Sequence, residues 1–411
     1  MESGRRPGLL VGESSLEHRL ASSAAEERAG FRVQQFVPNP DPRTPNSTNA
    51  WLPLKAARPS ALSFTIPPMR AVVIARRGTP VAPNVEVVED FPAPEAGPGE
   101  VIVRTQAAAM NHRDLDLGRG LPGRDLTYPL VAGADGAGVV ESVGQGVDES
   151  WLQRRVVLNA AIPRRDPVRP GIAPAAATRD MIGELTAGTL AEKFASPVAN
   201  VLDIGEADPA EAAAFALTHL TAWRMLITRA RLRAGQTVLI TGIGGGMGLA
   251  LLSVCRHFGC TTIVTSRQRW KLKKAAELGA DHGVLDTGED FSRVIRGLTS
   301  KRGVDICADS VGKAIHLSCI RSLARGGVFV TCGTTTGPDA VTDLARIFWN
   351  ECTIIGSTMG DMDEFRQVLS LWRRGLIKPV IDTVYDAADS SGAFERIESG
   401  EHFGKVVIRW P

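Results

Sequence analysis

The sequence predicts a two-domain α/β protein whose C-terminal half contains a doubly wound parallel sheet, and three observations support this fold class. The chain has 411 residues, which is more than a single hydrophobic core usually serves. After Met69 come short strands separated by glycine and proline, whereas from about Asp208 helical stretches alternate with short apolar strands. A glycine-rich string stands between the first of these later strands and the helix that follows it.

The composition is typical of a water-soluble globular protein, with 44% hydrophobic and 22% charged residues. The net charge of +2 gives no reason to expect nucleic acid or an anionic membrane as the main partner. No apolar run approaches the roughly 20 residues that a membrane-spanning helix needs. The six cysteines lie in the C-terminal half without a CxxC pair, so we expect reduced core thiols rather than disulfides or a zinc knot.

Residues 1–68 lack a sustained hydrophobic period and contain many prolines, so we expect a disordered extension there. Between Pro42 and Met69 basic residues occur without Asp or Glu, a composition that is also found in organelle-targeting segments. Glu26 and Glu27 lie upstream and argue against a transit peptide. We therefore predict a cytoplasmic protein, with a mitochondrial location as the alternative.

The first ordered domain is predicted to be a small β-barrel or sandwich. Residues 70–75, 101–105 and 138–143 have the pattern of strands, and glycine and proline break the chain between them. Residues 160–178 are rich in Pro, Arg and Ala without a clear period, and we expect an irregular loop there. Residues 379–410 are again strand-like and are expected to rejoin this domain.

Short apolar strands separated by helical segments predict the parallel sheet of the second domain, with right-handed crossovers. These strands are residues 237–241, 262–265, 283–285, 304–307, 328–331 and 353–355. We therefore assign residues 203–360 to the second domain. The first domain then consists of residues 69–202 together with residues 361–411.

The glycine-rich string Gly242-Ile-Gly-Gly-Gly-Met-Gly248 indicates a dinucleotide-binding Rossmann domain, because it joins the first strand directly to a helix. Gly245 lets the backbone approach a pyrophosphate, and Gly248 lets the helix pack close to the strand. The helix N-terminus offers N–H groups and a positive dipole end to phosphates. The alternative is a packing turn without a ligand. The predicted contacts are Gly242, Ile243 (in place of the usual first glycine), Gly245, Gly246, Met247 and Gly248.

The end of the second strand favours NADP(H) over NAD as the cofactor. An NAD enzyme usually carries Asp or Glu here for the ribose hydroxyls, and a carboxylate would repel a 2′-phosphate. This chain has Ser266, which can donate a hydrogen bond, and Arg267, which can pair with the phosphate. Lys271 adds positive charge, whereas Lys273 and Lys274 are better explained as a solvated helix start.

Segments spread along the chain carry a resemblance to a known family. They are Pro98-Gly-Glu-Val, Ala109-Met-Asn-His-Arg-Asp114, Pro129-Leu-Val-Ala-Gly-Ala-Asp-Gly-Ala-Gly138, Gly188-Thr-Leu-Ala-Glu192, Leu220-Thr-Ala-Trp-Arg224, the glycine string, Asp309-Ser-Val-Gly312, Ile355-Gly-Ser-Thr-Met359 and His402-Phe-Gly-Lys405. From Met69 onward the chain thus resembles the medium-chain dehydrogenase/reductase superfamily, in particular its zinc-free quinone oxidoreductase-like branch. The resemblance implies a GroES-like catalytic domain, a cofactor in the cleft beside the Rossmann domain, and a homodimer formed by pairing of Rossmann edge strands.

The metal ligands are where this chain departs from the zinc alcohol dehydrogenases of that superfamily. Where those enzymes place Cys, His-Glu and a second Cys or Asp, this chain has Asn111, Ala134-Asp135 and Leu217. No cysteine precedes Cys255, so the four-cysteine structural zinc lobe is absent too. Zinc needs three or four N, S or O ligands, and we therefore expect no bound metal.

Without zinc, no Lewis acid is available to lower the pKa of an alcohol. We therefore predict hydride transfer from NADPH to an electron-poor small molecule, either a quinone or an α,β-unsaturated carbonyl. The developing oxyanion then needs hydrogen-bond donors. Two alternatives remain: reduction of enoyl thioesters, which needs a basic, extended groove for the carrier's phosphates, and a low-turnover NADPH-binding sensor or structural protein.

Three residues are the candidate catalytic groups. Asn111 stands at a ligand position, and its amide can donate to the substrate or to the nicotinamide ribose; a capping role is the alternative. Tyr128 precedes the Pro129 segment at the mouth of the expected cleft and can donate a proton, unless it is an ordinary half-buried aromatic. Thr221 is implied by the resemblance to contact the nicotinamide or its ribose, and Asp135 is expected to hold the loop beneath the site.

Residues after the ends of the later strands complete the predicted cofactor site, because ligands of open α/β sheets bind beyond the carboxyl ends of strands. They are Ser310, Cys332, Gly333, Ser357, Thr358 and Met359. Phe403 and Lys405 are added on the strength of the family motif, which brings the returning chain over the cofactor. His112, His219 and His402 lie in family motifs and are expected to be mainly structural.

Overall fold

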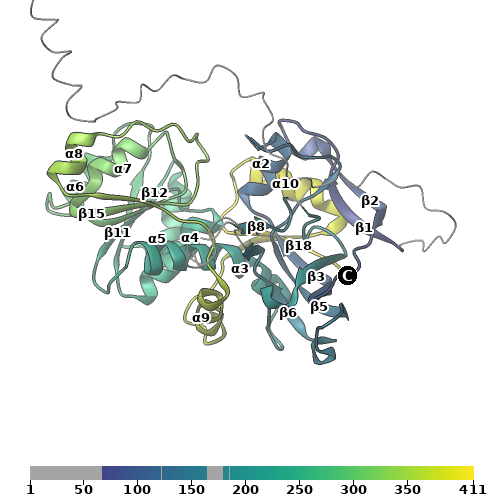
Figure 1. Cartoon of the computed structure of the whole chain (residues 1–411). Coiled ribbons are helices and arrows are strands. Elements are labelled where there is room, and N and C mark those ends of the chain that lie inside the picture. Colours follow the sequence, from purple (N-terminus) through teal and green to yellow (C-terminus); the bar gives the residue numbers. More distant parts are fainter. Residues whose placement is uncertain (1–66, 122, 164–178, 185) are drawn as a thin grey trace, which may run out of the picture. The chain divides into compact units, whose positions relative to one another are not determined.

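The computed structural model describes residues 67–121, 123–163, 179–184 and 186–411, and Figure 1 traces them from purple to yellow. The predicted extension, residues 1–68, therefore lies outside the described residues except for its last two. Within the described residues no helix combines the length and the apolar character that crossing a membrane requires.

The N-terminal lobe is built from antiparallel strands. One sheet has the order β2-β1-β4, and a larger sheet has the order β10-β6-β5-β3-β18-β17, with β9 also paired to β3. The bounds are β1 Pro68–Ile74, β2 Val85–Pro92, β3 Glu100–Ala109, β4 Leu130–Val131, β5 Asp135–Val143, β6 Arg155–Leu158, β9 Lys193–Pro197, β10 Val201–Asp203, β17 Ile381–Asp386 and β18 Lys405–Arg409. The three strands predicted near the start of this lobe are confirmed as β1, β3 and β5.

The irregular loop predicted for residues 160–178 was wrong at its beginning. Ala161–Pro163 form strand β7, which pairs antiparallel with β8, Arg179–Met181. The apolar Ala161 is buried in this pair, whereas the prediction weighed the proline and arginine content of the whole segment. Residues 164–178 lie outside the described part of the chain.

The second lobe contains the predicted parallel sheet, in the order β13-β12-β11-β14-β15-β16. Alternate residues of β11 enter different cores: Val238 and Ile240 pack in the core that includes α4, and Leu239 packs in the core that includes α6 and α7. The sheet is thus covered on both faces, which confirms the doubly wound fold. The bounds are β11 Thr237–Ile240, α4 Gly246–His257, β12 Thr261–Ser266, α5 Arg269–Glu277, β13 His282–Leu285, α6 Ser292–Leu298, β14 Val304–Asp309, α7 His316–Ser322, β15 Leu323–Thr331, α8 Leu344–Trp349 and β16 Thr353–Gly356.

The chain then returns to the first lobe, as predicted. After α9, Met362–Arg373, strand β17 leads through α10, Ser390–Glu398, to β18. Strand β18 pairs antiparallel with β3. A strand from the C-terminal end of the chain therefore lies in the same sheet as strands β3 and β5 of the first lobe. Figure 1 shows this as the yellow α10 and β18 among the blue elements of the N-terminal lobe.

Helix α3, Pro209–Trp223, connects the two lobes. It is rich in alanine and almost wholly buried, because it packs against β3 and β5 of one lobe and α4 of the other. A π-helical turn, Arg224–Arg229, continues it, and the buried Arg224 guanidinium there lies 2.7 Å from the Glu364 carboxylate on α9. This pairing fixes α9 against the end of α3.

His219 lies within this buried helix and is 2% exposed. Burial lowers its pKa to about 4, and its ring stacks on Phe215 at a centroid distance of 5.0 Å. In the unfolded chain a histidine takes up a proton near pH 6.5. Between about pH 6.5 and pH 4 the unfolded state therefore binds a proton that the folded state does not, and the free energy of unfolding falls as the pH is lowered.

We predict that His219→Asn flattens this dependence. Between pH 7 and pH 4.5 the wild-type protein should lose on the order of 2 kcal/mol more of its free energy of unfolding than the variant loses. Urea unfolding followed by circular dichroism at several pH values measures this. An equal loss in both proteins would contradict the assignment.

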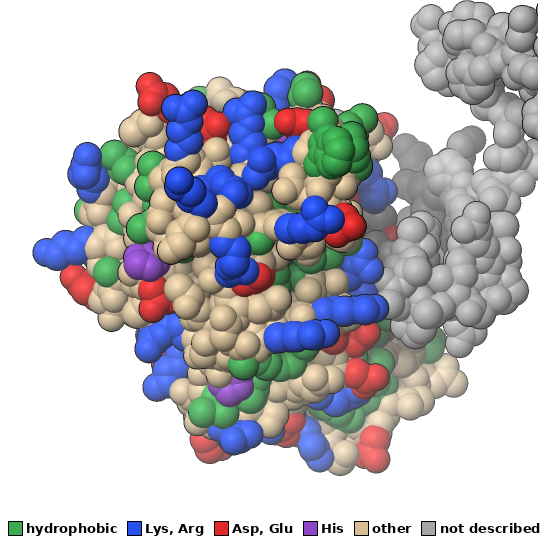
Figure 2. Space-filling view, turned by 90° about the vertical axis from the view of Figure 1, so that its left-hand side faces the viewer, with side chains coloured by type: hydrophobic (Ala, Val, Ile, Leu, Met, Phe, Trp, Pro, Cys, Tyr) green, Lys and Arg blue, Asp and Glu red, His purple; other side chains and the backbone are tan. Residues whose placement is uncertain are grey.

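The outer edge of the parallel sheet is apolar and exposed. Strand β16 is the edge strand, and beside it α8 exposes Leu344, Phe348 and Trp349, the last of these by 69%. Figure 2 looks onto this lobe, where Lys and Arg side chains are widely spread and apolar side chains gather in smaller groups. We propose that these exposed aromatic and aliphatic groups form the interface of the homodimer that the sequence resemblance implied.

We predict that the protein is a homodimer in solution and that Trp349→Glu converts it to a monomer, because a carboxylate would be desolvated in the interface. Analytical ultracentrifugation measures the change. Val294→Glu on α6 is the control, since Val294 is also exposed (53%) but lies away from the edge strand. A wild-type protein that sediments as a monomer would contradict the proposal.

Candidate active site

The glycine-rich loop turns sharply between β11 and α4. Gly242 and Gly244 have φ values of +63° and +117°, which side chains other than glycine rarely adopt. A Cβ on Gly248 would lie 3.1 Å from the Gly242 carbonyl oxygen, the close helix approach predicted for this residue. A Cβ on Gly245 would meet nothing within 4 Å, so the backbone there faces open space. The start of α4 is therefore accessible to a phosphate group.

Two predicted loop contacts have buried or half-buried side chains. Ile243 is 2% exposed and packs in the core, and its N–H donates to the Thr265 carbonyl oxygen at 2.8 Å. Met247 is half-buried against the same core. For Ile243, only the backbone remains available to a ligand.

The residues predicted to bind the 2′-phosphate of NADP differ in whether their side chains are already engaged within the protein. Arg267 is exposed, and no ion pair among the described residues involves it. Ser266 accepts a hydrogen bond from the Gln268 N–H at 3.1 Å, which leaves its own hydroxyl hydrogen free to donate. Lys271, by contrast, donates from Nζ to the Gly400 carbonyl oxygen at 2.5 Å, and burial lowers its pKa. Lys271 thus ties the returning chain to α5.

The predicted residues at the strand ends lie along one edge of the sheet. The register aligns Asp309 with Thr331 and Thr331 with Gly356, so the residues that follow these three strands are neighbours. They include Ser310, Cys332, Gly333, the half-buried Ser357 and the exposed Thr358. Cys332 remains a thiol because burial raises its pKa to about 12. Met359 is 8% exposed and packs in the core.

A cluster of three polar side chains forms where the sheet of the first lobe meets the glycine loop. Lys405 Nζ lies 2.8 Å from Asp135 Oδ2 and donates to Asn111 Oδ1 at 2.6 Å. Asn111 Nδ2 in turn donates to Asp135 Oδ2 at 2.9 Å. Asp135 is fully buried and Lys405 is 4% exposed, whereas Asn111 is half-buried. The buried ion pair therefore lies behind the more accessible amide.

Strand register brings these residues together. Ala109 on β3 is opposite both Asp135 on β5 and Val407 on β18. Two residues farther along the antiparallel β3–β18 pair, Asn111 faces Lys405. The side chain of Lys405 then crosses the glycine loop, because a Cβ on Gly246 would lie only 2.6 Å from Lys405 Cδ.

Backbone groups complete the surroundings of Asp135. Its Oδ1 accepts the Leu217 N–H at 2.8 Å, and its carbonyl oxygen accepts the Thr189 hydroxyl at 2.8 Å. The prediction that Asp135 holds the loops of the site agrees with these contacts, but it did not include the pairing with Lys405.

Asp114 is a second buried carboxyl, and sequence reasoning gave it no role. It accepts the N–H groups of Asn111 at 2.8 Å and of Gly133 at 3.1 Å, and burial raises its pKa to about 6. It therefore holds Asn111 at the start of α2, His112–Arg119. An acid three residues after an N-cap asparagine is the signal that would have identified it.

The cluster does not fit a zinc ion. At the three ligand positions the chain offers an amide, one carboxylate and the backbone N–H of Leu217, and an ammonium group already pairs with that carboxylate. His112 points elsewhere, with Nε2 at 3.8 Å from Asp116. Across the described ranges, no three His, Cys, Asp or Glu side chains are arranged to hold a metal.

Thr221 carries a buried hydroxyl that is not used within the described part of the protein. It lies on α3, is 5% exposed, and its hydroxyl has no hydrogen-bond partner among the described residues. A buried hydroxyl is rarely left unsatisfied, so a polar group from a bound molecule is the natural partner. The residues present therefore fit a dinucleotide that runs from the glycine loop toward Thr221.

Tyr128 is not brought to this cluster. Its hydroxyl donates to the Leu117 carbonyl oxygen at 2.6 Å, and its ring packs against the core of the first lobe. The geometry matches the alternative of a half-buried aromatic, and it gives Tyr128 no contact with Asn111 or Lys405.

The returning chain closes over the glycine loop just before Lys405. The Gly404 N–H donates to the Gly244 carbonyl oxygen at 2.9 Å, and the Phe403 ring lies 6.1 Å from that of Trp270 on α5. Burial lowers the pKa of the neighbouring His402 to about 4, so this histidine is neutral at physiological pH. Phe403 itself is 5% exposed and therefore supports the loop from within.

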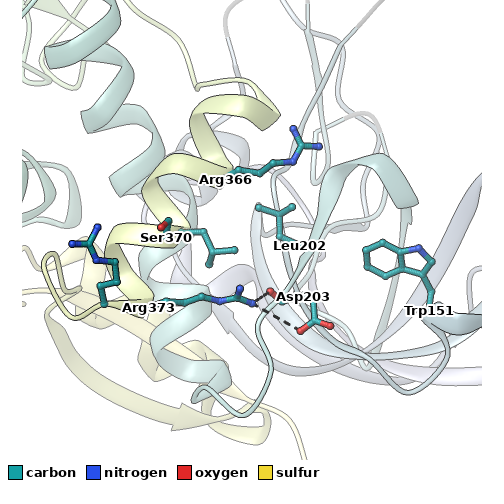
Figure 3. A pocket seen from close by; sticks show the side chains of 8 residues that line it. Trp151, Leu202, Asp203, Arg366, Ser370 and Arg373 are labelled. Carbon is teal, nitrogen blue, oxygen red and sulfur yellow. Dashed lines mark hydrogen bonds and ion pairs between the residues drawn. The ribbon is translucent and has the colours of Figure 1, made fainter.

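A groove lies apart from this cluster. About 570 Å³ in volume, it separates Trp151 and Leu202 of the first lobe from arginines of α9, among them Arg366 and Arg373 (Figure 3). Arg373 contacts Asp203 across it. None of its lining residues belongs to the Asn111 cluster, so the groove and the cluster are separate features.

Comparison with known proteins agrees with this architecture. The family model described as "Alcohol dehydrogenase GroES-like domain" matches residues 97–206, and the model described as "Zinc-binding dehydrogenase" matches residues 246–374. Among the described residues, the Asn111 cluster offers no set of zinc ligands that corresponds to the second description.

Individual proteins are similar over most of the chain. The "Zinc-type alcohol dehydrogenase-like protein YogA" of Leptosphaeria maculans is 31% identical, over 77% of this chain and 92% of its own length. The "Synaptic vesicle membrane protein VAT-1 homolog" of Rattus norvegicus is 28% identical, over 83% of this chain and 84% of its own. A crystal structure of an NAD-dependent alcohol dehydrogenase is 34% identical with a TM-score of 0.77, covering 84% of this chain and all of that one. The chain therefore belongs to the medium-chain dehydrogenase/reductase superfamily of oxidoreductases.

Proposed function

We propose that the protein is an NADPH-dependent oxidoreductase that transfers hydride, without a metal ion, to a quinone or an α,β-unsaturated carbonyl compound. The observation that carries this proposal is the buried Lys405–Asp135 pair, which contacts Asn111, the residue that the sequence resemblance places at a zinc-ligand position. Alcohol oxidation needs a metal ion or a free base to take the hydroxyl proton, and in the cluster the Asp135 carboxylate is already paired with Lys405. A quinone or an enone is already electron-poor and accepts hydride with only hydrogen-bond assistance.

The cofactor would be held by residues of the second lobe. The loop from Gly242 to Gly248 and the start of α4 would bind the pyrophosphate, and Ser266 with Arg267 would bind the 2′-phosphate. Thr221 would hydrogen-bond to the nicotinamide end. When bound and reduced, the nicotinamide supplies the hydride. Asn111, the accessible member of the cluster, would orient the acceptor.

A second candidate function is the reduction of enoyl thioesters. The observation that favours it is the groove along α9, whose rim carries Arg366, Arg373 and Arg374. Guanidinium groups bind phosphates well, so this rim suits the phosphate groups of a thioester carrier. The quinone or enone acceptor remains the first proposal, because Arg373 is already engaged by Asp203.

The test is turnover of NADPH with 9,10-phenanthrenequinone, with a small enone and with crotonyl-CoA, followed at the nicotinamide absorbance band. We expect oxidation of NADPH by the first two acceptors, no stoichiometric zinc in the protein and no loss of rate with EDTA. Stoichiometric zinc with an EDTA-sensitive rate would contradict the proposal. Faster turnover of crotonyl-CoA that Arg374→Glu impairs through KM would favour the second candidate, and tight NADPH binding without turnover of any acceptor would favour a sensor.

Cofactor preference is tested with Arg267→Ala. Because a hydrogen bond to a charged group contributes about 1.5–3 kcal/mol, this change should weaken NADPH binding roughly 10- to 100-fold. NADH binding should change little, since NADH lacks the 2′-phosphate. Fluorescence titration measures both affinities, with Lys273→Ala as a control on the exposed part of α5. An equal effect on both cofactors would contradict the NADP assignment.

A further inference from the structure

We propose that Lys405 supplies, from within the chain, the positive charge that a catalytic metal ion supplies elsewhere in the family, and that its ammonium donates a hydrogen bond to the oxyanion formed on the substrate. This inference rests on the proposed function and adds a catalytic residue to it. It begins from the donors of Lys405. Of its three N–H groups, two are used by Asn111 Oδ1 and Asp135 Oδ2, and no third acceptor occurs among the described residues.

Lys405 lies between the predicted cofactor site and the predicted substrate site. Its methylene chain packs on Gly246, at the start of the helix that would bind the pyrophosphate, and a Cβ there would also lie 3.0 Å from Thr218 Cγ2 on α3. Its ammonium reaches Asn111, whose half-buried amide is the accessible end of the cluster. The charge therefore lies between the glycine loop and the group expected to meet the acceptor.

Because Lys405 is buried, its positive charge acts strongly on a nearby oxyanion. Lys405 is 4% exposed and Asp135 is fully buried, so little water screens the ammonium group. Asp135 and Asn111 hold it in place before any substrate arrives, so no reorganisation is needed as charge develops. The other charged or titratable groups nearby are Asp114, which accepts two backbone N–H groups, and His219, which is neutral at physiological pH.

The chemical step balances with reduced nicotinamide as the two-electron donor. Hydride adds to the electron-poor carbon of the acceptor, and the π electron pair of the conjugated system moves onto the carbonyl oxygen. The resulting oxyanion accepts a hydrogen bond from the third N–H of Lys405, and for a quinone a proton shift from the reduced carbon to oxygen then gives the hydroquinone. Solvent supplies the proton that completes the product, and the Lys405–Asp135 pair keeps its charge state.

A purely structural ion pair predicts a different outcome, and this difference allows a test. Removing one partner of a buried pair leaves an uncompensated charge, whereas replacing both with neutral groups of similar shape is often tolerated. If the pair only supports the fold, neutralising both partners should restore activity together with stability. If the ammonium acts on the oxyanion, stability should return without activity.

The experiment compares Lys405→Met, Asp135→Asn and the double variant with the wild-type protein. We expect each single variant to melt at a lower temperature than the double variant. In the double variant we expect kcat to fall about 10²- to 10³-fold while the dissociation constant of NADPH changes by less than about threefold. Recovery of wild-type kcat in the double variant would overturn the proposal.

The matched control is Lys193→Met with Glu141→Gln. This pair also joins a lysine and a carboxylate in the first lobe, at 2.7 Å, but both side chains are partly exposed. Neutralising it should change neither kcat nor NADPH affinity. A loss of kcat equal to that of the Lys405→Met/Asp135→Asn variant would mean that any lost pair has this effect, and it would overturn the specific role of Lys405.

A binding measurement keeps the test independent of turnover. The probe is 4-nitrophenolate, which carries an oxyanion and is detected by its absorbance, with and without NADP⁺. The wild-type protein should bind it at least about tenfold more tightly than the double variant, because a charge-assisted hydrogen bond is lost. Equal affinity, or no binding to the wild-type protein, would overturn the role of Lys405 even if the proposed reaction fails for every acceptor.

Discussion

The pairing of Lys405 with Asp135 is the interaction on which the organisation of the site depends. A fully buried carboxylate is tolerated only when it is paired and hydrogen-bonded, and Asp135 also accepts from Asn111 and from the backbone of Leu217. Breaking such a buried pair from one side typically destabilises a protein by about 3–5 kcal/mol. The same pair therefore secures the junction of β5, β18 and α3 and sets the electrostatics of the candidate active site.

In this arrangement the glycine loop has a second role besides binding a ligand. Two lysine side chains cross it, Lys271 beside Gly244 and Lys405 beside Gly246, and a Cβ at either glycine would collide with the lysine stem. The absence of side chains on this loop thus leaves room for the protein's own cations as well as for phosphate. Cofactor binding and the cation near Asn111 are consequently adjacent features of one short segment.

The sequence predicted well what depends on local pattern. The alternation of short apolar runs with helical segments predicted where the strands of the parallel sheet lie. The glycine string predicted where α4 begins. The sequence could not predict which residues that are far apart in the chain lie next to each other in the structure. Lys405 could be assigned only by its motif, because its closeness to Asn111 follows from the register of β18 against β3. Tyr128 shows the reverse case, since its position before the Pro129 segment suggested chemistry but its hydroxyl donates to a backbone carbonyl oxygen.

The register of β18 also has a consequence for the order in which the molecule is assembled. Asp135 and Lys405 are 270 residues apart, so the strand that begins with Asp135 is synthesised long before the lysine that neutralises its carboxylate. Until the final strand joins β3, this carboxylate has to remain hydrated or take up a proton. Closing the sheet of the N-terminal lobe and completing its polar cluster are therefore a single late event in folding.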